Sequence, residues 1–190
     1  MSLIATASEV LTLLRREGVE GCLVGGLAVS VRCDPRFTRD VDLALAIKDD
    51  SHAESIVNSL SRQGFRIDAV VEQETKKRLA MTRLVSHDDT SIDLLIASSG
   101  IEAEVVAVAE PLEVVKQIIL PVARVGHLIA LKLLSVAPGR ETDYSDLRNL
   151  AQVADEFEWQ RAKSAVRLVV ERGYARDRDL EADLETLRRA

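Results

Sequence analysis

The segment 40–47 reads Asp-Val-Asp-Leu-Ala-Leu-Ala-Ile and alternates between two kinds of side chain. Its large apolar residues all occupy odd positions, whereas Asp40 and Asp42 occupy even ones. This period of two predicts a β-strand with one face in the core, and it places both carboxylates on the other face. Carboxylates this close repel each other unless a proton or a cation neutralises them. The alternative is an ordinary solvated strand face, because a lone Asp-x-Asp is common.

Patterns along the rest of the chain predict an α/β (α+β) fold, with a mixed, partly antiparallel sheet followed by a helical C-terminal region. A boundary is expected between residues 1–123 and 124–190, and Pro138-Gly139 predicts a turn. The remaining strands are predicted at 22–24, 65–71, 78–85, 91–97 and 118–123. Helices are predicted at 8–16 with Ser8 as N-cap, and at 27–32, 51–63, 102–109, 126–136, 142–153, 159–171 and 177–189.

Composition excludes several functional classes. Aromatic residues make up 3% of the chain and its formal net charge is -6, which argues against an aromatic platform for single strands and against a uniformly basic surface. A local basic patch remains compatible with these numbers. The two cysteines, Cys22 and Cys33, form no zinc pattern. Since neither a signal peptide nor a membrane span is apparent, we expect a cytoplasmic protein without membrane contacts.

A third carboxylate interrupts the apolar strand Ser91-Ile92-Asp93-Leu94-Leu95-Ile96. If this strand neighbours the strand of Asp40 and Asp42, the three acids converge. Hard oxygen ligands select Mg²⁺ or Mn²⁺. Three acids around two such ions can stabilise the attacking and leaving oxygens of a phosphoryl displacement.

Gly25-Gly26 follows a predicted strand and precedes a predicted helix. Glycines at such a junction let the backbone approach a phosphate, and the start of a helix offers free N–H groups. An ordinary tight turn is the alternative.

Cations lie near these segments. Lys132 sits within an apolar helical stretch, where it either contacts phosphate, reaches solvent or pairs with an acid. Arg32, Arg36 and Arg39 precede the acids and could balance their charge, bind a triphosphate or meet an RNA backbone. Asp146 is either functional or part of a surface ion pair.

Taken in order, these residues resemble the nucleotidyltransferase superfamily of DNA polymerase β. Within it, the AbiEii/AbiGii toxin-like branch often shows Arg-x-Thr-x-Asp-[Ile/Val]-Asp-Leu and Lys…Arg-x-x-Asp-x-x-Asp-Leu. The resemblance covers roughly residues 20–150. The matching segments are Val24-Gly25-Gly26, Arg36-Phe37-Thr38-Arg39-Asp40-Val41-Asp42-Leu43, Ile92-Asp93, Leu131-Lys132-Leu133-Leu134 and Arg140-Glu141-Thr142-Asp143-Tyr144-Ser145-Asp146-Leu147.

The resemblance implies a nucleotidyltransferase core at 1–123 and assigns roles within it. Asp40, Asp42 and Asp93 would bind two Mg²⁺ or Mn²⁺ ions, and Asp146 would assist catalysis at the acceptor. The nucleoside triphosphate (NTP) would be bound by Gly25, Gly26, Arg39 and Lys132. Many superfamily members carry Gly-Ser where this chain has Gly25-Gly26, so backbone N–H groups must replace the serine hydroxyl.

The predicted activity is transfer of a nucleoside monophosphate from an NTP to an acceptor hydroxyl, with release of pyrophosphate. Transfer RNA is one candidate acceptor, because relatives in this branch modify its ends; a protein hydroxyl and a small antibiotic are others. The branch also suggests a toxin with a cognate antitoxin partner. The alternatives are a catalytically inactive nucleotide-binding or regulatory module, and a generic α/β domain with exposed acids.

Overall fold

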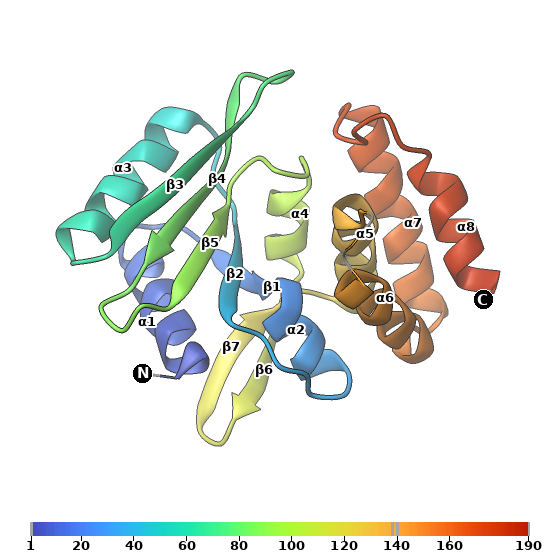
Figure 1. The fold of residues 1–190 in the computed structure, drawn as a ribbon, viewed down its shortest axis with the longest axis horizontal. Coiled ribbons are helices and arrows are strands. Elements are labelled where there is room, and N and C mark those ends of the chain that lie inside the picture. The colour runs from blue at the N-terminus through green and yellow to red at the C-terminus, as the bar shows by residue number, and fades with distance from the viewer. Residues whose placement is uncertain (1, 138, 140, 190) are drawn as a thin grey trace.

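The computed structural model describes residues 2–137, 139 and 141–189, and Figure 1 shows their arrangement. Their elements follow in the order α1 (Leu3–Arg16), β1 (Gly21–Val24), α2 (Gly25–Arg32), β2 (Asp40–Leu45), α3 (Asp50–Arg62), β3 (Arg66–Gln73), β4 (Arg78–Val85), β5 (Ser91–Leu95), α4 (Glu102–Ala107), β6 (Glu110–Val115), β7 (Ile118–Val122), α5 (Val125–Ser135), α6 (Glu141–Val153), α7 (Glu156–Glu171) and α8 (Leu180–Arg189).

The strands form a single mixed sheet in the order β3-β4-β5-β2-β1-β7-β6. β2 pairs in parallel with β5, and β1 pairs in parallel with β7, while the other pairs are antiparallel. The middle of the sheet is anchored by fully buried apolar side chains, among them Leu23, Leu43 and Leu94. The predicted mixed sheet, with its antiparallel pair at 78–97, is therefore confirmed.

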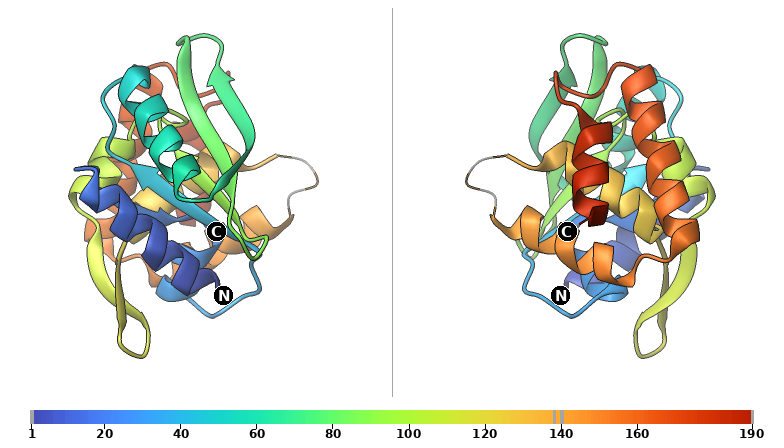
Figure 2. Two further views of the ribbon diagram at one scale, coloured as in Figure 1. Left: turned by 90° about the vertical axis from the view of Figure 1, so that its left-hand side faces the viewer. Right: turned by 90° about the vertical axis from the view of Figure 1, so that its right-hand side faces the viewer.

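Helices lie on both sides of this sheet. α1 and α3 lie on one side, and the helices α5 to α8 gather on the other, as the views in Figures 1 and 2 agree. α2 packs against β1 and β2 and also contacts α5 and α6, so it connects the sheet to the C-terminal helices. The hairpin of β6 and β7 projects from the body of the molecule.

The structure differs from the predicted elements in several places, among them α1, β6 and α8. α1 begins at Leu3, because the Ser2 hydroxyl accepts the N–H of Ala5 and caps the helix there; Ser8 lies inside it. The sequence did not predict β6, because Pro111 weakens the strand pattern there. Proline is tolerated in β6 because this strand lies at the edge of the sheet. α8 begins three residues later than expected, because Asp177 has a positive φ of 58°.

β7 ends at Val122 and α5 begins at Val125. A domain boundary between 123 and 124 stays a prediction. In the predicted Pro138-Gly139 turn, Gly139 has a φ of 84°, and Pro138 lies outside the described residues. Arg140 of the C-terminal motif also lies outside them. In the part of the chain described here, no helix combines the length and apolar character that crossing a membrane requires.

Candidate active site

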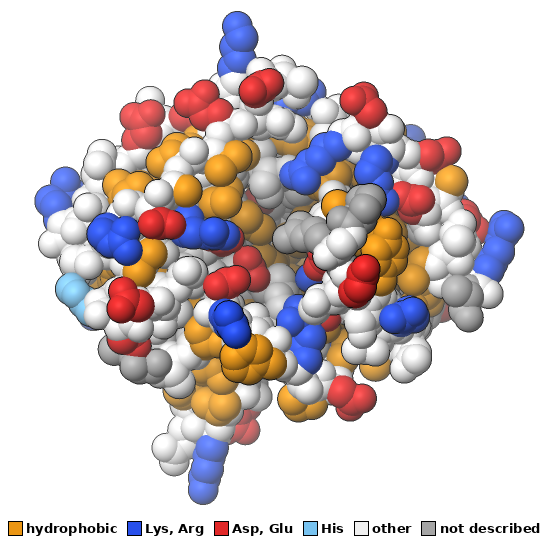
Figure 3. All heavy atoms as spheres, viewed as in Figure 1, with side chains coloured by type: hydrophobic (Ala, Val, Ile, Leu, Met, Phe, Trp, Pro, Cys, Tyr) orange, Lys and Arg blue, Asp and Glu red, His pale blue; other side chains and the backbone are white. Residues whose placement is uncertain are grey.

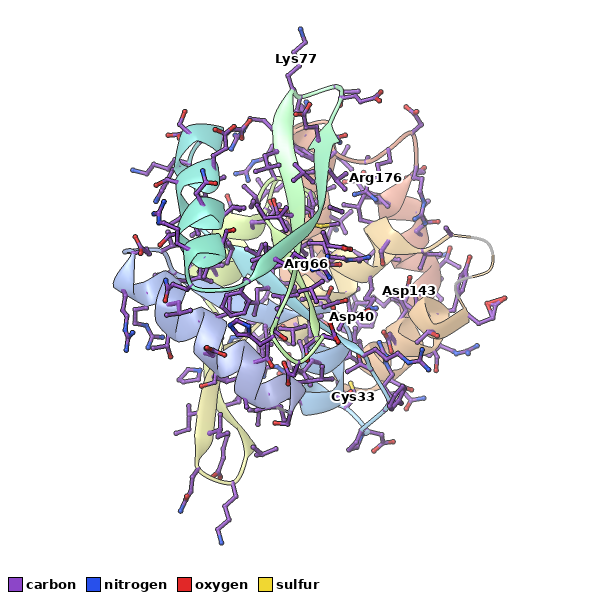
Figure 4. All side chains as sticks on the ribbon, turned by 60° about the vertical axis from the view of Figure 1, so that its left-hand side comes forward. Cys33, Asp40, Arg66, Lys77, Asp143 and Arg176 are labelled. Carbon is purple, nitrogen blue, oxygen red and sulfur yellow. The ribbon has the colours of Figure 1, made fainter. Side chains whose placement is uncertain are left out.

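A cavity of about 630 Å³ opens between the sheet and the helices α2, α5 and α6. Figure 3 shows the molecule hollowed near its centre, with acidic and basic side chains around the hollow. Asp40 on β2 and Asp143 on α6 both line this cavity, and Figure 4 shows the two elements that carry them. The predicted site residues that line it are Gly25, Gly26, Arg39, Asp40, Asp42, Asp93 and Lys132.

Asp42 and Asp93 occupy directly opposite positions on the parallel strands β2 and β5. Residues paired in this way point to the same face of a sheet, so the two carboxylates stand side by side. Asp40 lies two residues before Asp42 on that face, opposite Ser91, and is exposed. The strand neighbourhood on which the three-acid site depends is therefore present.

The environment of Asp42 disfavours its charged form. Burial raises the pKa of the Asp42 carboxyl to about 6, and the negative charges of Asp93 and Asp40 act in the same direction. Lys132 and a hydrogen bond from the Gly26 N–H oppose this rise. A carboxyl placed beside a second carboxyl away from water is stabilised by a nearby cation.

The Asp93 carboxylate is held by an arginine that the sequence did not single out. Arg83 lies opposite Asp93 on β4 and donates from Nε to Oδ1 and from Nη2 to Oδ2, each at 2.7 Å. This two-point bond raises the pKa of the Arg83 guanidinium and fixes the Asp93 carboxylate. Only the register of the hairpin reveals the pairing, because a lone arginine in a strand pattern usually faces solvent.

The two glycines allow close approach of protein groups. Gly25 has a φ of +60°, and a Cβ at this position would lie 1.9 Å from Asp42 Oδ2. A Cβ on Gly26 would lie 2.6 Å from Arg36 Nη2 and 2.9 Å from Thr38 Oγ1. The absence of side chains thus lets Asp42 and the segment 36–38 reach the start of α2. Contact between the glycines and a triphosphate stays a prediction.

Lys132 pairs with acids. Its Nζ lies 2.7 Å from Asp143 Oδ1 and 2.7 Å from Asp146 Oδ2, and the lysine is buried. The structure therefore shows the ion pairing that the sequence left open. Lys132 also lies near enough to Asp42 to lower the pKa of that carboxyl. Its contact with phosphate remains a prediction.

Asp146 connects Lys132 to Arg36. Arg36 donates two hydrogen bonds to the Asp146 carboxylate, from Nε to Oδ1 at 2.6 Å and from Nη2 to Oδ2 at 2.7 Å. The side chain of Asp146 is fully buried. The sequence had left open a surface ion pair for Asp146, and the burial rules this out. Arg36 and Asp143 join the site as residues whose partners the sequence did not indicate.

Arg39 lies at the mouth of the cavity. Its guanidinium stands 5.5 Å from the centre of the exposed Phe37 ring. It makes no ion pair within the described part of the chain, although Asp40 follows it directly. Arg39 is thus available to a ligand at the entrance, whereas Arg36, Arg83 and Lys132 are each engaged by a carboxylate.

Asp42 and Asp93 are the residues of this site that could bind a metal ion. Among the described residues, no group of three or more His, Cys, Asp or Glu side chains has the geometry to hold a metal ion. Asp42 and Asp93 nevertheless offer adjacent oxygen ligands of the kind that Mg²⁺ and Mn²⁺ prefer. The raised pKa of Asp42 marks a place where added positive charge is stabilising. These two acids have the ligand chemistry that a hard divalent cation prefers, and Arg83 competes for Asp93.

A protein family matches most of this chain. The family of the nucleotidyl transferase AbiEii toxin, from type IV toxin–antitoxin systems, matches residues 22–190. The chain belongs to the AbiEii family. This match extends beyond the motifs at 20–150 and includes the C-terminal helices, and it makes the chain a nucleotidyltransferase.

Three solved structures are similar to this chain, and the first of them shares its fold. An antigenic nucleotidyltransferase-like protein from Paracoccidioides brasiliensis superimposes with a TM-score of 0.54 at 15% identity, covering 99% of this chain and 92% of that one. Lincosamide antibiotic adenylyltransferase LnuA, lincomycin-bound, has a TM-score of 0.49 at 16% identity, covering 77% and 94%. ANT(2")-Ia in complex with adenylyl-2"-tobramycin has a TM-score of 0.49 at 14% identity, covering 98% and 94%. No curated protein sequence matches the chain.

Proposed function

We propose that this AbiEii-family protein transfers a nucleoside monophosphate from an NTP to an acceptor hydroxyl with the help of Mg²⁺ or Mn²⁺. The observation that carries the proposal is the side-by-side placement of Asp42 and Asp93 in a cavity that Lys132 also lines. In the reaction, the acceptor oxygen bonds to the α-phosphorus, the bond to the bridging oxygen breaks, and pyrophosphate and the hydroxyl proton are released.

The resemblance assigns the metal-binding role to the three acids on β2 and β5. In the proposal, Asp40, Asp42 and Asp93 would hold two divalent ions, which would neutralise developing negative charge and lower the pKa of the acceptor hydroxyl. Arg83 binds both oxygens of the Asp93 carboxylate and would compete with a divalent ion for them. Asp146 acts as a positioning residue, because it is fully buried and both its oxygens already bind cations.

The triphosphate would be bound by positive charge that also lines the cavity. Lys132 and Arg36 line the cavity and are held in place by Asp146. The N–H groups at Gly25 and Gly26 lie at the start of α2, where the helix dipole favours an anion. The Gly26 N–H already donates to Asp42, so it would have to be shared between that carboxylate and phosphate. Binding of NTP would require Lys132 to share its charge between Asp143 and phosphate.

The experiment compares wild type with Asp42→Asn and Asp93→Asn, which keep side-chain shape but remove the charge. Asp68→Asn serves as a matched control, because Asp68 is exposed on the edge strand β3. Each protein is incubated with Mg²⁺, each of the four labelled NTPs and total cellular RNA or protein, and released pyrophosphate is measured.

We expect the two site variants to lose at least about 100-fold in rate, with the control unchanged. Equal rates in wild type and both site variants would refute the proposal. Binding of NTP by wild type without any turnover would instead identify a catalytically inactive nucleotide-binding module.

We further propose that the acceptor is an RNA such as transfer RNA, and that the protein acts as the toxin of a toxin–antitoxin pair. The family description supports the toxin role. Induced expression should then arrest growth with wild type but not with Asp42→Asn, and a cognate antitoxin should restore growth. Normal growth with active wild-type protein would contradict the toxin role.

A further inference from the structure

Phe37 is an aromatic side chain left exposed at the mouth of the active-site cavity. Its residue is 79% exposed and lines the cavity, on the segment that joins α2 to β2. Phe37 is the one aromatic residue among the described residues that line the cavity. A large flat ring facing solvent beside a reaction site offers a surface for stacking.

A cation accompanies this ring. The Arg39 guanidinium lies 5.5 Å from the centre of the Phe37 ring and, within the described residues, has no carboxylate partner. The cations deeper in the cavity are different, because Arg36, Arg83 and Lys132 each bind an acid. The positive charge at the mouth is therefore available to an incoming ligand.

The backbone under this ring is held in place. Arg36 donates from Nη1 to the Phe37 carbonyl at 3.0 Å, and the same guanidinium is fixed by Asp146. On the other side, Thr38 lies against Gly26, which leaves no room for a side chain there. These contacts fix the backbone that carries the ring, so less conformational freedom of the backbone is lost when a ligand stacks on it.

We propose that Phe37 and Arg39 form a stacking site for a nucleobase near the reacting end of a single-stranded RNA acceptor. The ring stacks on the base, and the Arg39 guanidinium, which the family resemblance assigns to the NTP, instead meets the neighbouring phosphate of the acceptor. Since the net charge of the chain is -6, RNA binding must depend on such a local site instead of a broad basic surface. The inference rests on the proposed nucleotidyl transfer, and it concerns the acceptor alone.

The test measures acceptor KM separately from NTP binding. The probes are unfractionated transfer RNA and a single-stranded oligoribonucleotide, with Phe37→Ala, Phe37→Leu and Phe37→Trp compared with wild type. Phe157→Ala is the matched control, because Phe157 is 81% exposed but lies on α7, outside the residues that line the cavity. For Phe37→Ala we expect KM for RNA to rise by about 5- to 100-fold, as loss of one stacked base predicts, with unchanged affinity for Mg²⁺–NTP.

The other variants distinguish stacking from apolar contact. Phe37→Trp should keep the wild-type KM, whereas Phe37→Leu should behave like Phe37→Ala. In a Trp159→Phe background, the new indole of Phe37→Trp should lose fluorescence when the oligoribonucleotide binds. This spectroscopic change reports contact with a base and would not follow from a purely structural role.

Each outcome separates this inference from the proposed function. Equal KM values for wild type and Phe37→Ala, or an indole signal that RNA leaves unchanged, would overturn the stacking site while transfer itself stands. Efficient transfer to a protein or a small molecule, with neither transfer to RNA nor binding of RNA, would likewise overturn it. Failure of wild type to bind any NTP or release pyrophosphate would instead refute the proposed function.

Discussion

Arg83 and Asp93 face each other across β4 and β5 and form a two-point ion pair, with both donor–acceptor distances at 2.7 Å. In this arrangement the guanidinium occupies both oxygens of a carboxylate that we assign to metal binding. Arg83 is also near enough to Asp40 for the acid to raise its pKa. A positive charge in this position should compete with a divalent ion.

Replacing Arg83 should therefore strengthen metal binding. For Arg83→Gln we expect the affinity for Mn²⁺ to rise by about 3- to 10-fold, because a unit charge near a partly exposed site contributes on the order of 1 kcal/mol. Titration of Mn²⁺ followed by electron paramagnetic resonance measures the free ion. Arg66→Gln, on the exposed edge strand, should leave the affinity unchanged. Weaker binding by Arg83→Gln would show that the arginine mainly orients Asp93.

Removing the charge of Asp146 should destabilise the fold. In Asp146→Asn, Arg36 and Lys132 lose the buried carboxylate that both of them bind. Breaking a buried ion pair typically costs roughly 3–5 kcal/mol, so the free energy of unfolding should fall by an amount of that order. Urea denaturation measures it.

The exposed pair of Arg167 and Glu171 supplies the control for this prediction. Glu171→Gln should change the free energy of unfolding by less than about 1 kcal/mol, because exposed ion pairs contribute little. Similar losses in Asp146→Asn and Glu171→Gln would contradict a structural role for the buried network.

Gly25→Ala should damage both stability and the site. The backbone at Gly25 has a φ of +60°, and the added Cβ would lie 1.9 Å from Asp42 Oδ2. Left-handed backbone costs a non-glycine residue about 1–2 kcal/mol, and displacement of Asp42 adds to this. The midpoint temperature of thermal unfolding and the affinity for NTP should both fall.

Gly18→Ala separates the two effects. Gly18 has a similar φ of +76°, but a Cβ added there would meet nothing within 4 Å. We therefore expect Gly18→Ala to lower the free energy of unfolding by about 1–2 kcal/mol, with NTP binding intact. Equal behaviour of the two variants would show that the contact with Asp42 has no consequence.

The stability of the protein should decrease in mild acid because of His127. Burial lowers the pKa of the His127 imidazole from 6.5 to about 4, and the positive charge of Arg161 contributes. The unfolded chain therefore takes up this proton more readily than the folded protein. The contribution of His127 to the free energy of unfolding is fully present above pH 6.5, declines as the pH falls, and is lost completely below about pH 4.

Between pH 6.5 and pH 4, protonation linked to His127 should lower the free energy of unfolding by roughly 3 kcal/mol, because one pKa unit corresponds to about 1.4 kcal/mol. Urea denaturation at a series of pH values measures it. His127→Gln removes the titrating group, so its free energy of unfolding should vary less over the same range. An unchanged pH dependence in His127→Gln would assign the effect to other groups.

Local patterns in the sequence determined the type and approximate extent of most elements. The alternation in 40–47 was sufficient to predict β2 and its buried face, since Val41, Leu43 and Leu45 are all buried. The two apolar runs at 78–97 predicted the hairpin of β4 and β5. Such patterns work because the side-chain period within one strand or helix is fixed by its own backbone geometry.

The tertiary structure decided which residues meet. The parallel register that places Asp42 beside Asp93 joins segments far apart in the chain, and nothing local to either strand encodes it. The same holds for Asp146, whose oxygens bring together Arg36 and Lys132 from two different parts of the fold. A periodic pattern predicts which face of an element is buried. Which elements pair, and which charged side chains meet, depends on how the helices and strands pack together.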